Sequence, residues 1–265
     1  MSAQSQASRK PIVAVIPVFN ERDTIADIVR RTMSLVDRTI VVDDGSTDGS
    51  HLALDGLDVQ LIRQPVNQGK GAAPLRGIDS ARSIGAEFVV TLDADNQHPP
   101  ECIPDLLRQA DTAHIVIGSR AADAGRIPTV RLRANRTANF FISWACGHWI
   151  EDTQCGFRVY PTGVFDRIRL RRRRLSGFVF ESEVLIEACR QGIRVTPVPI
   201  PALYAEVLQR PSHFRPVFDI AAIVIMVTGK LVVRAFFIPG LIRSQRERRG
   251  VSRERSCNRN QNRPL

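Results

Sequence analysis

Short apolar segments that end in polar clusters constrain the fold of this chain more than any other feature. Their length, their β-branched residues and the turn residues around them predict strands at 12–18, 39–43, 58–63, 87–92 and 114–118. Helices are predicted at 22–36, 71–84 and 101–110, the last preceded by Pro99 and Pro100. Strands that alternate with helices in this way predict an α/β fold with a mostly parallel sheet.

The polar clusters stand where the predicted strands end. In open α/β sheets, ligands gather beyond the carboxyl ends of the strands. We therefore expect Asn20, Asp43, Asp44 and Asp93 to converge on one crevice. The pattern also fits a Rossmann enzyme, although no G-x-G-x-x-G follows the first strand. NQGKG at 67–71 precedes a helix instead, where free amides could receive a phosphate.

The second half of the chain is less regular. We predict a helix near 129–149, a loop and strand around 152–160, a helix at 178–191 and a strand at 193–199. Residues 1–10 and the basic tail 243–265 are predicted to be disordered.

Residues 212–242 are predicted to form an amphipathic helix at the membrane interface. The longest uncharged run, Ile220 to Gly229, has ten residues, about half of what spans a bilayer. Plotted as a helix, Arg215, Asp219, Lys230 and Arg234 share an arc of roughly 100°. This arc could face lipid phosphates; the alternative is a helix docked on the protein's own core. Pro239 and Gly240 are expected to end it.

Charge and cysteine content narrow the class of partner. The chain has 37 basic and 27 acidic residues, a formal net charge of +10, with six arginines between 167 and 174. Such a balance suits nucleic acid, an anionic membrane or phosphorylated substrates. The arginine-rich stretch lacks interleaved aromatic residues for base stacking, which disfavours nucleic acid. Five scattered cysteines and an N-terminus without an apolar core suit a reducing cytoplasm.

The sequence TLDADNQHPP at 91–100 predicts a site for a hard divalent cation. Asp93 and Asp95 lie one residue apart where a strand gives way to a loop, so both can reach one ion. Gln97 offers a neutral oxygen two residues further on. Mg²⁺ takes a few oxygen ligands from protein and the rest from water and phosphates.

Six motifs occur in order: IPVFNE at 16–21, VVDDGSTDGS at 41–50, NQGKG, TLDADNQHPP, IGSR at 117–120 and EDTQCGFRVY at 151–160. Together they resemble the family 2 glycosyltransferases, most closely the bacterial polyprenyl-phosphate (dolichol-phosphate type) hexosyltransferases. The resemblance implies a GT-A domain over 11–211. It also implies transfer of a hexose, with inversion, from a GDP-mannose or UDP-glucose type donor to a polyprenyl phosphate, with Mg²⁺ or Mn²⁺ on the donor diphosphate.

The resemblance also assigns roles to residues. For the donor it implies Pro17, Phe19, Glu21, Asp43, Asp44, Gly69, Lys70, Asp93 and Arg120. For catalysis it implies Asp95, Asp152 and Arg120, and for the acceptor Arg158, His213 and Arg215. The expected metal ligands are Asp93, Asp95 and Gln97. Cys155 is interpreted as a small packing residue, not as a nucleophile.

Three alternatives stay open. The same fold could transfer sugar to a soluble or glycan hydroxyl, which would need a carboxylate base, whereas a polyprenyl phosphate is already ionised. A more distant alternative is a non-catalytic, membrane-peripheral nucleotide-binding protein; a nucleic-acid-binding module would show salt-dependent binding in competition with donor. We expect a cytoplasmic protein attached peripherally to the inner face of the cell membrane, alone, as a homo-oligomer or with a membrane protein.

Overall fold

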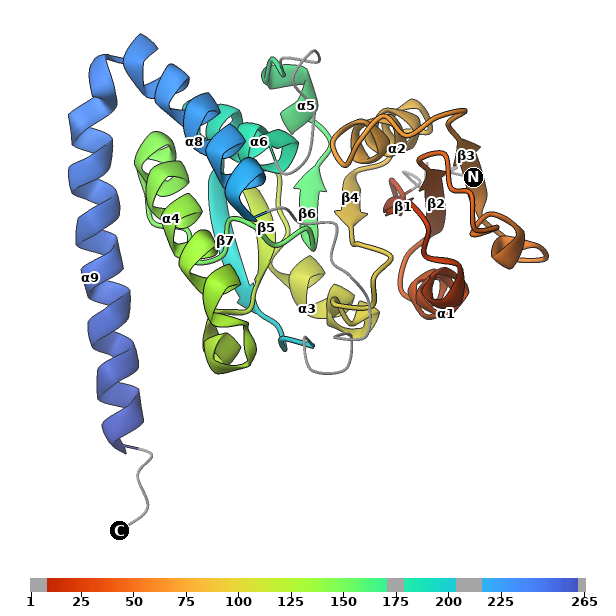
Figure 1. The fold of residues 1–265 in the computed structure, drawn as a ribbon, viewed down its shortest axis with the longest axis horizontal. Helices are drawn as coiled ribbons and strands as arrows, with labels where there is room; N and C mark the ends of the chain where they lie inside the picture. The colour runs from red at the N-terminus through yellow and green to blue at the C-terminus, as the bar shows by residue number, and fades with distance from the viewer. Residues whose placement is uncertain (1–8, 171–178, 204–215, 262–265) are drawn as a thin grey trace, which may run out of the picture.

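The computed structural model describes residues 9–170, 179–203 and 216–261. Its centre is a sheet in the order β3-β2-β1-β4-β6-β5-β7 (Figure 1). The strands are β1 (Ile12–Val18), β2 (Arg38–Asp43), β3 (Gln60–Arg63), β4 (Phe88–Thr91), β5 (His114–Ser119), β6 (Arg158–Pro161) and β7 (Arg194–Pro199). β6 runs antiparallel to β4 and β5, and the other pairs are parallel. The predicted mostly parallel α/β sheet is confirmed.

Helices cover both faces of this sheet. In the view of Figure 1, α1 (Arg22–Met33) and α3 (Ile103–Arg108) lie below it, and α2 (Ala72–Ser83) and α6 (Val179–Arg190) lie above it. Parallel strands covered on both sides are apolar throughout, which explains why Val13 to Ile16 of β1 are fully buried. A Cβ at Gly77 would lie 2.3 Å from Cγ1 of Val15, so this glycine lets α2 approach β1 closely.

The remaining helices lie together beyond the β7 end of the sheet. They are α4 (Thr129–Cys146), α8 (Pro216–Val233) and α9 (Ile238–Gln261), while the short α5 (Val164–Arg167) follows β6. Four 3₁₀ turns complete the described elements: η1 (Leu52–Leu54), η2 (Pro100–Cys102), η3 (Ala121–Arg126) and η5 (Ala235–Phe237).

Helix α8 is docked on the protein, which corrects the predicted orientation. Its residues Ile223, Val227 and Leu231 are buried in the core. Lys230, placed by the sequence analysis on a lipid-facing arc, lies 2.9 Å from a carboxylate oxygen of Glu183 on α6. A helical plot shows which residues share a face, but the direction of that face depends on what the helix packs against. Arg215 and the start of the predicted segment lie outside the described residues.

The prediction that the tail from residue 243 is disordered is wrong for most of its length, because α9 continues to Gln261. Pro239 and Gly240 do not end a helix but lie in the first turn of α9, where proline is tolerated. Two contacts tie α9 to the loop after α4. The backbone N–H of Trp149 donates to Glu247 (2.8 Å), and the Arg248 guanidinium lies 5.0 Å from the Trp149 ring centroid.

Among the described residues, no single helix is both long and apolar enough to cross a bilayer. One pair of consecutive helical segments has the length and apolar composition of a membrane span only when the two are taken together, Ala221–Val233 and Ala235–Ser252. The chain bends by 109° between them.

Candidate active site

The turn after β4 carries Asp93 and Asp95 at the edge where the parallel strands end. Thr24 on α1 donates a hydrogen bond of 2.7 Å to the carbonyl of Ala94, which fastens this turn to the first helix. The backbone N–H of Gln97 donates to Oδ1 of Asp95 at 3.1 Å. The turn is therefore held from outside and from within, with both carboxylates partly exposed.

His98 joins this pair, although the sequence analysis did not select it. Ligand atoms of Asp93, Asp95 and His98 lie within 4.8 Å of one another. The imidazole is 2% exposed, and its Nδ1 has no hydrogen-bond partner and lies 4.0 Å from Oδ2 of Asp93. The sequence signal that could have identified His98 as a ligand is its position directly after Gln97, since imidazole is a frequent ligand of transition metals. Gln97, predicted as the third ligand, lies half-buried in the same turn.

The NQGKG loop brings Lys70 to these carboxylates. Asp44 fixes the loop by accepting hydrogen bonds from the backbone N–H groups of Gln68 (2.8 Å) and Gly69 (2.9 Å). Desolvation acts to lower the pKa of Lys70, but Asp93, Asp95 and Glu181 outweigh it and raise that pKa. Lys70 is therefore a cation at the entrance to the acidic turn.

Asp43 and Asp44 have a structural task in this conformation. The buried Asp43 carboxylate accepts a hydrogen bond of 2.8 Å from the backbone N–H of Ser46 and lies 3.3 Å from Nε of Arg63. Gly45, between Asp44 and Ser46, has φ +77°, and a Cβ there would lie 2.7 Å from the backbone of Val66. The DDGS motif thus ties the loop after β2 to the loop after β3. The nucleoside contacts predicted for it stay predictions.

The predicted donor residues Pro17, Phe19 and Glu21 lie half-buried at the end of β1, beside that loop. The backbone N–H of Glu21 donates to Oγ of Ser50 at 3.0 Å. The first three motifs therefore form one continuous wall of the crevice.

Arg120 and Asp152 form a buried ion pair on the opposite side of the acidic turn. Nε of Arg120 lies 2.8 Å from Oδ2 of Asp152, and a terminal guanidinium nitrogen lies 3.0 Å from Oδ1, so the pairing is bidentate. Burial acts to raise the pKa of Asp152, but the Arg120 charge and its hydrogen bonds lower it below its usual value. Arg120 also helps to lower the pKa of Asp93. Asp152 is thus a fixed carboxylate anion.

Arg158 does not fit the acceptor role predicted for it. Its side chain is fully buried and donates to the carbonyls of Thr153 (2.8 Å), Cys155 (2.7 Å) and Glu181 (2.9 Å) and to the Tyr160 hydroxyl (3.1 Å). A guanidinium enclosed in this way cannot reach an acceptor in this structure. Its role is to hold the loop 153–155 against the start of α6.

Glu181 is a further site residue, and it approaches Asp93 across Gly156. A Cβ at Gly156 would lie 2.9 Å from Oδ2 of Asp93 and 3.2 Å from Oε1 of Glu181. Burial raises the pKa of Glu181, an effect that nearby Arg158 only partly opposes.

Cys155 packs beneath the site. Its Sγ lies 3.5 Å from Nε2 of His98, and burial raises the pKa of this thiol to about 12. The thiol therefore stays protonated, in line with a packing role. Two other predicted acceptor residues, His213 and Arg215, lie outside the described part of the chain.

Comparison with known families decides the class of this site. A family model described as glycosyl transferase family 2 matches residues 13–169, more than half of the chain. The chain belongs to glycosyl transferase family 2. The acidic turn, Lys70 and the Arg120–Asp152 pair all lie within the matched region, so they are the candidate active site of a glycosyltransferase.

Relatives of this glycosyltransferase include two proteins whose names contain a polyprenol or undecaprenyl lipid. Polyprenol monophosphomannose synthase of Mycolicibacterium smegmatis is 34% identical over 200 residues, which cover 71% of this chain and 76% of the relative. Undecaprenyl-phosphate mannosyltransferase of Micrococcus luteus is 28% identical over 199 residues, 71% of this chain and 82% of the relative.

Solved structures confirm the GT-A fold. Glucosyl-3-phosphoglycerate synthase from Mycobacterium tuberculosis, in complex with Mn²⁺, UDP and glucosyl-3-phosphoglycerate, superposes with a TM-score of 0.58 at 22% identity, covering 86% of this chain and 80% of that one. Mannosyl-3-phosphoglycerate synthase from Rubrobacter xylanophilus gives a TM-score of 0.65 at 18% identity, with coverages of 84% and 74%.

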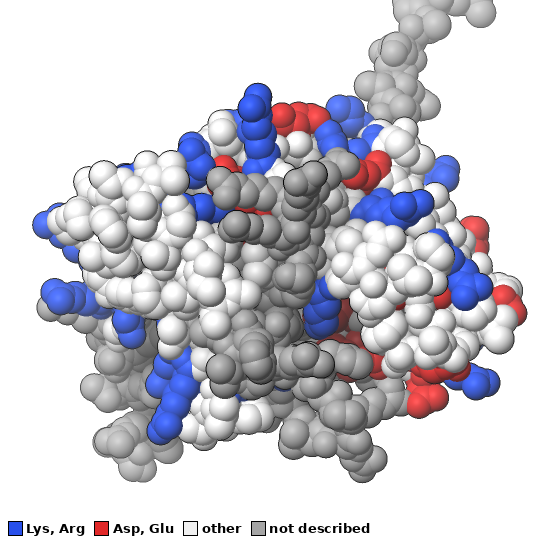
Figure 2. Space-filling model, turned by 45° about the horizontal axis from the view of Figure 1, so that its top comes forward, with Lys and Arg blue, Asp and Glu red and all other residues white. Residues whose placement is uncertain are grey.

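The residues of the acidic turn fit a divalent cation. Two carboxylates and a buried imidazole nitrogen without a hydrogen-bond partner place their ligand atoms within 4.8 Å of one another, so all three can face one ion. Oxygen ligands suit Mg²⁺ and Mn²⁺, and the imidazole adds a ligand that Mn²⁺ accepts. Figure 2 shows acidic and basic side chains next to each other in a hollow of the face that it presents.

Proposed function

We propose that this glycosyltransferase transfers a hexose from a nucleotide-diphosphate sugar to a polyprenyl phosphate, with inversion at the anomeric carbon. Two relatives named for polyprenyl or undecaprenyl phosphate support the acceptor. The observation that carries the reaction class is the acidic turn of Asp93, Asp95 and His98 opposite the fixed Arg120–Asp152 pair.

The proposed donor class rests on positive charge placed to bind a diphosphate. A cation held by Asp93, Asp95 and His98, with Gln97 as a further oxygen donor, would act as a Lewis acid on the diphosphate leaving group. Lys70 lies close enough to this turn for the carboxylates to raise its pKa. Its ammonium would bind a phosphate oxygen of the donor and orient the leaving group.

The proposed acceptor class rests on the protonation state of Asp152. A general base works best when its pKa lies near the working pH, whereas the Arg120 pair holds the pKa of Asp152 low. Such a carboxylate is poorly suited to take a proton from a sugar hydroxyl. An acceptor phosphate is already ionised, so Asp152 needs only to hold Arg120 in place beside the reacting groups. This favours a phosphate over a hydroxyl acceptor.

An apolar surface beside the fold supports attachment to a membrane. We call the exposed residues Ile225, Val232, Val233, Phe236, Ile238 and Ile242 of α8, η5 and α9 the apolar face. Figure 2 shows a broad uncharged area on the side where Figure 1 places α8. Contiguous exposed apolar residues on a water-soluble domain often mark a membrane or protein interaction site. We propose that the apolar face lies in the membrane interface and brings the site to its lipid acceptor.

Sugar transfer tests this function. The full chain is incubated with labelled GDP-mannose, UDP-glucose or related donors, with Mg²⁺ or Mn²⁺, and with or without polyprenyl phosphate. We expect label in the organic phase only when metal and lipid are both present, and its loss in Asp95→Ala. Donor binding with transfer to a soluble hydroxyl acceptor would instead favour the alternative acceptor class. Absence of donor binding would contradict the enzyme assignment of this site.

A further inference from the structure

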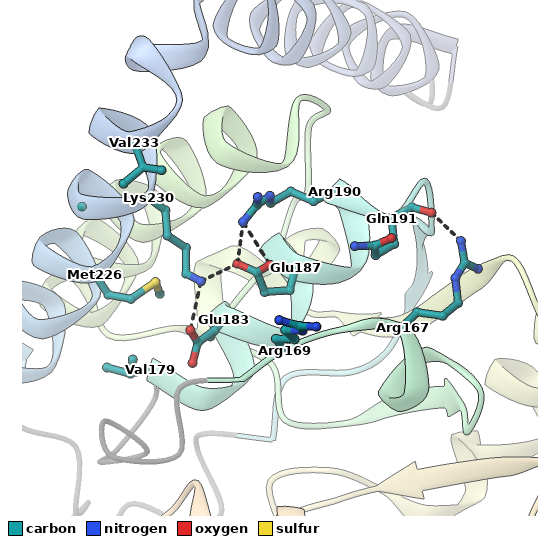
Figure 3. Close-up of a pocket in the computed structure, with 11 residues that line it drawn as sticks. Arg167, Arg169, Val179, Glu183, Glu187, Arg190, Gln191, Met226, Lys230 and Val233 are labelled. Atoms are coloured by element: carbon teal, nitrogen blue, oxygen red, sulfur yellow. Dashed lines mark hydrogen bonds and ion pairs between the residues drawn. The ribbon is translucent and has the colours of Figure 1, made fainter.

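A pocket of about 390 Å³ lies on α6, away from the candidate active site (Figure 3). Its walls come from α6, from α8 and from the end of α5 with the residues that follow it. Arg167, Arg169, Glu183, Glu187, Arg190 and Lys230 supply its charged groups. Nothing in the donor or metal chemistry proposed above uses this pocket.

The geometry of α6 separates the pocket from the sugar-transfer site. Consecutive residues of a helix differ in direction by about 100°. Glu183, Glu187 and Arg190 follow the i, i+4, i+7 spacing of one helix face and all line the pocket. Glu181, two residues before Glu183, points in nearly the opposite direction, toward Asp93. The pocket is therefore a second site and not an extension of the first.

The charge of the pocket is positive after its internal ion pairs are formed. Lys230 lies 2.9 Å from Glu183 and also pairs with Glu187, and Arg190 lies 3.1 Å from Glu187. These pairs match the two carboxylates with two cations. Arg167 and Arg169 then remain as the excess charge, and both are solvent-exposed. Arg167 donates a hydrogen bond of 2.6 Å to the carbonyl of Gln191, which fixes the direction of its guanidinium (Figure 3).

The other side of the pocket is apolar and continues onto the apolar face. Val179, Met226 and Val233 supply this lining. Val233 is 79% exposed and also belongs to the apolar face. A ligand that suits both halves carries an anionic head and a hydrocarbon chain. A free phosphate would use only the arginines.

We propose that this pocket binds the phosphate headgroup of an anionic membrane phospholipid. Arg167 and Arg169 contact the phosphate, whereas Arg190 stays paired with Glu187. The adjacent methylene groups lie against Met226 and Val233, and the chain continues along the apolar face. Lys230 and Arg190 together keep Glu183 and Glu187 neutralised, so that these carboxylates do not repel the headgroup. The inference extends the proposed membrane contact but requires neither donor sugar nor polyprenyl phosphate.

The test measures binding of a soluble short-chain lipid by calorimetry. The full chain is titrated with monomeric dihexanoyl phosphatidylglycerol, with glycerol phosphate and with inorganic phosphate. We expect the lipid to bind at least tenfold more tightly than either phosphate, because only the lipid contacts Met226 and Val233. Equal affinity for inorganic phosphate would assign the pocket to a free anion and overturn the proposal that it binds a phospholipid.

Two double variants with the same change in net charge locate the site. Arg167→Gln with Arg169→Gln should weaken lipid binding by about tenfold or more, given the usual contribution of a cation near a lipid phosphate. Arg30→Gln with Arg76→Gln removes two exposed arginines from α1 and α2 and should leave the affinity unchanged. An equal loss of lipid affinity in both variants would reveal a general effect of net charge and overturn the assignment of the lipid site to this pocket.

Sugar transfer in detergent separates this inference from the proposed function. The Arg167→Gln, Arg169→Gln variant should keep the wild-type KM for polyprenyl phosphate, since the pocket lies across α6 from the transfer site. A raised KM would assign the pocket to the acceptor lipid and contradict a separate phospholipid site. Wild-type transfer without phospholipid binding would overturn this inference alone, whereas phospholipid binding without transfer would overturn only the proposed function.

Discussion

At the scale of single residues, Gly156 determines how closely the loop before β6 approaches the acidic turn. A Cβ in Gly156→Ala would lie 2.9 Å from Oδ2 of Asp93, so the carboxylate or the loop must move. Small misplacements of site groups cost up to about a hundredfold, and we expect Gly156→Ala to weaken Mn²⁺ binding at least tenfold, measured by titration followed by electron paramagnetic resonance. Gly163→Ala is the matched control because its added Cβ would meet no atom within 4 Å. Equal Mn²⁺ affinity in both variants would contradict a metal site at Asp93.

The Arg120–Asp152 pair gives a prediction about stability and pH. Asp152→Asn leaves the Arg120 guanidinium buried without its counter-charge, which typically costs about 3–5 kcal/mol. Because the pKa of Asp152 is lower in the folded protein than its usual 3.8, its stabilising effect is fully present above that value and disappears as the pH falls through the folded-state pKa. The difference in unfolding free energy between wild type and Asp152→Asn, measured with urea, should therefore be constant from pH 6 to 8 and shrink below about pH 4. A difference that grew on acidification would contradict an ionised Asp152.

At the scale of elements, the sequence predicted the strands and most helices well, but it missed the basic helix α9. β1 was predicted with its observed bounds, and β2, β5 and β7 to within one residue, because buried parallel strands are apolar runs between turn residues. The side chains that needed tertiary information are Arg158 and Lys230. Both are charged residues that fold inward because partners distant in sequence, Glu181 and Glu183, lie there. Helix α9 was missed because its residues from 243 onward are almost all polar or charged, and its observed contacts depend on Trp149 from another element.

The junction of α6 and α8 can be tested through Lys230. Lys230→Met removes the cation between Glu183 and Glu187, which are 1% and 8% exposed. Because removing one partner of a buried ion pair is costly, we expect a loss of about 3 kcal/mol in unfolding free energy, measured by chemical denaturation. Adding Glu183→Gln and Glu187→Gln to this variant should restore much of the loss, since the two negative charges that Lys230 offsets in the wild type are then gone. If the triple variant were less stable than Lys230→Met alone, repulsion between the two carboxylates would not be the cause.

At the scale of the whole molecule, the apolar face and the crevice must act together if the acceptor is a membrane lipid. The face exposes Ile225 and Val232 on the side of α8 opposite to its buried residues. Placing a charge there should oppose insertion without disturbing the core, as the cost of a charge applies only where the side chain meets hydrocarbon. We expect Ile225→Asp with Val232→Asp to reduce cosedimentation with phospholipid vesicles about tenfold or more, since each substitution replaces a favourable apolar contact by an unfavourable charge.

The same variant separates attachment from chemistry. Its binding of nucleotide-sugar donor should equal that of the wild type, because the crevice lies at the carboxyl ends of the strands and not on α8. Its transfer to polyprenyl phosphate embedded in vesicles should fall in parallel with cosedimentation, while transfer to the same lipid in detergent should persist. The control pair, Leu52→Asp and Val130→Asp, adds the same charge at leucine and valine side chains that are 59% and 67% exposed elsewhere on the molecule. If this pair lowered vesicle binding as much, added negative charge alone would explain the loss, and the apolar face would not be the surface that brings the site to its acceptor.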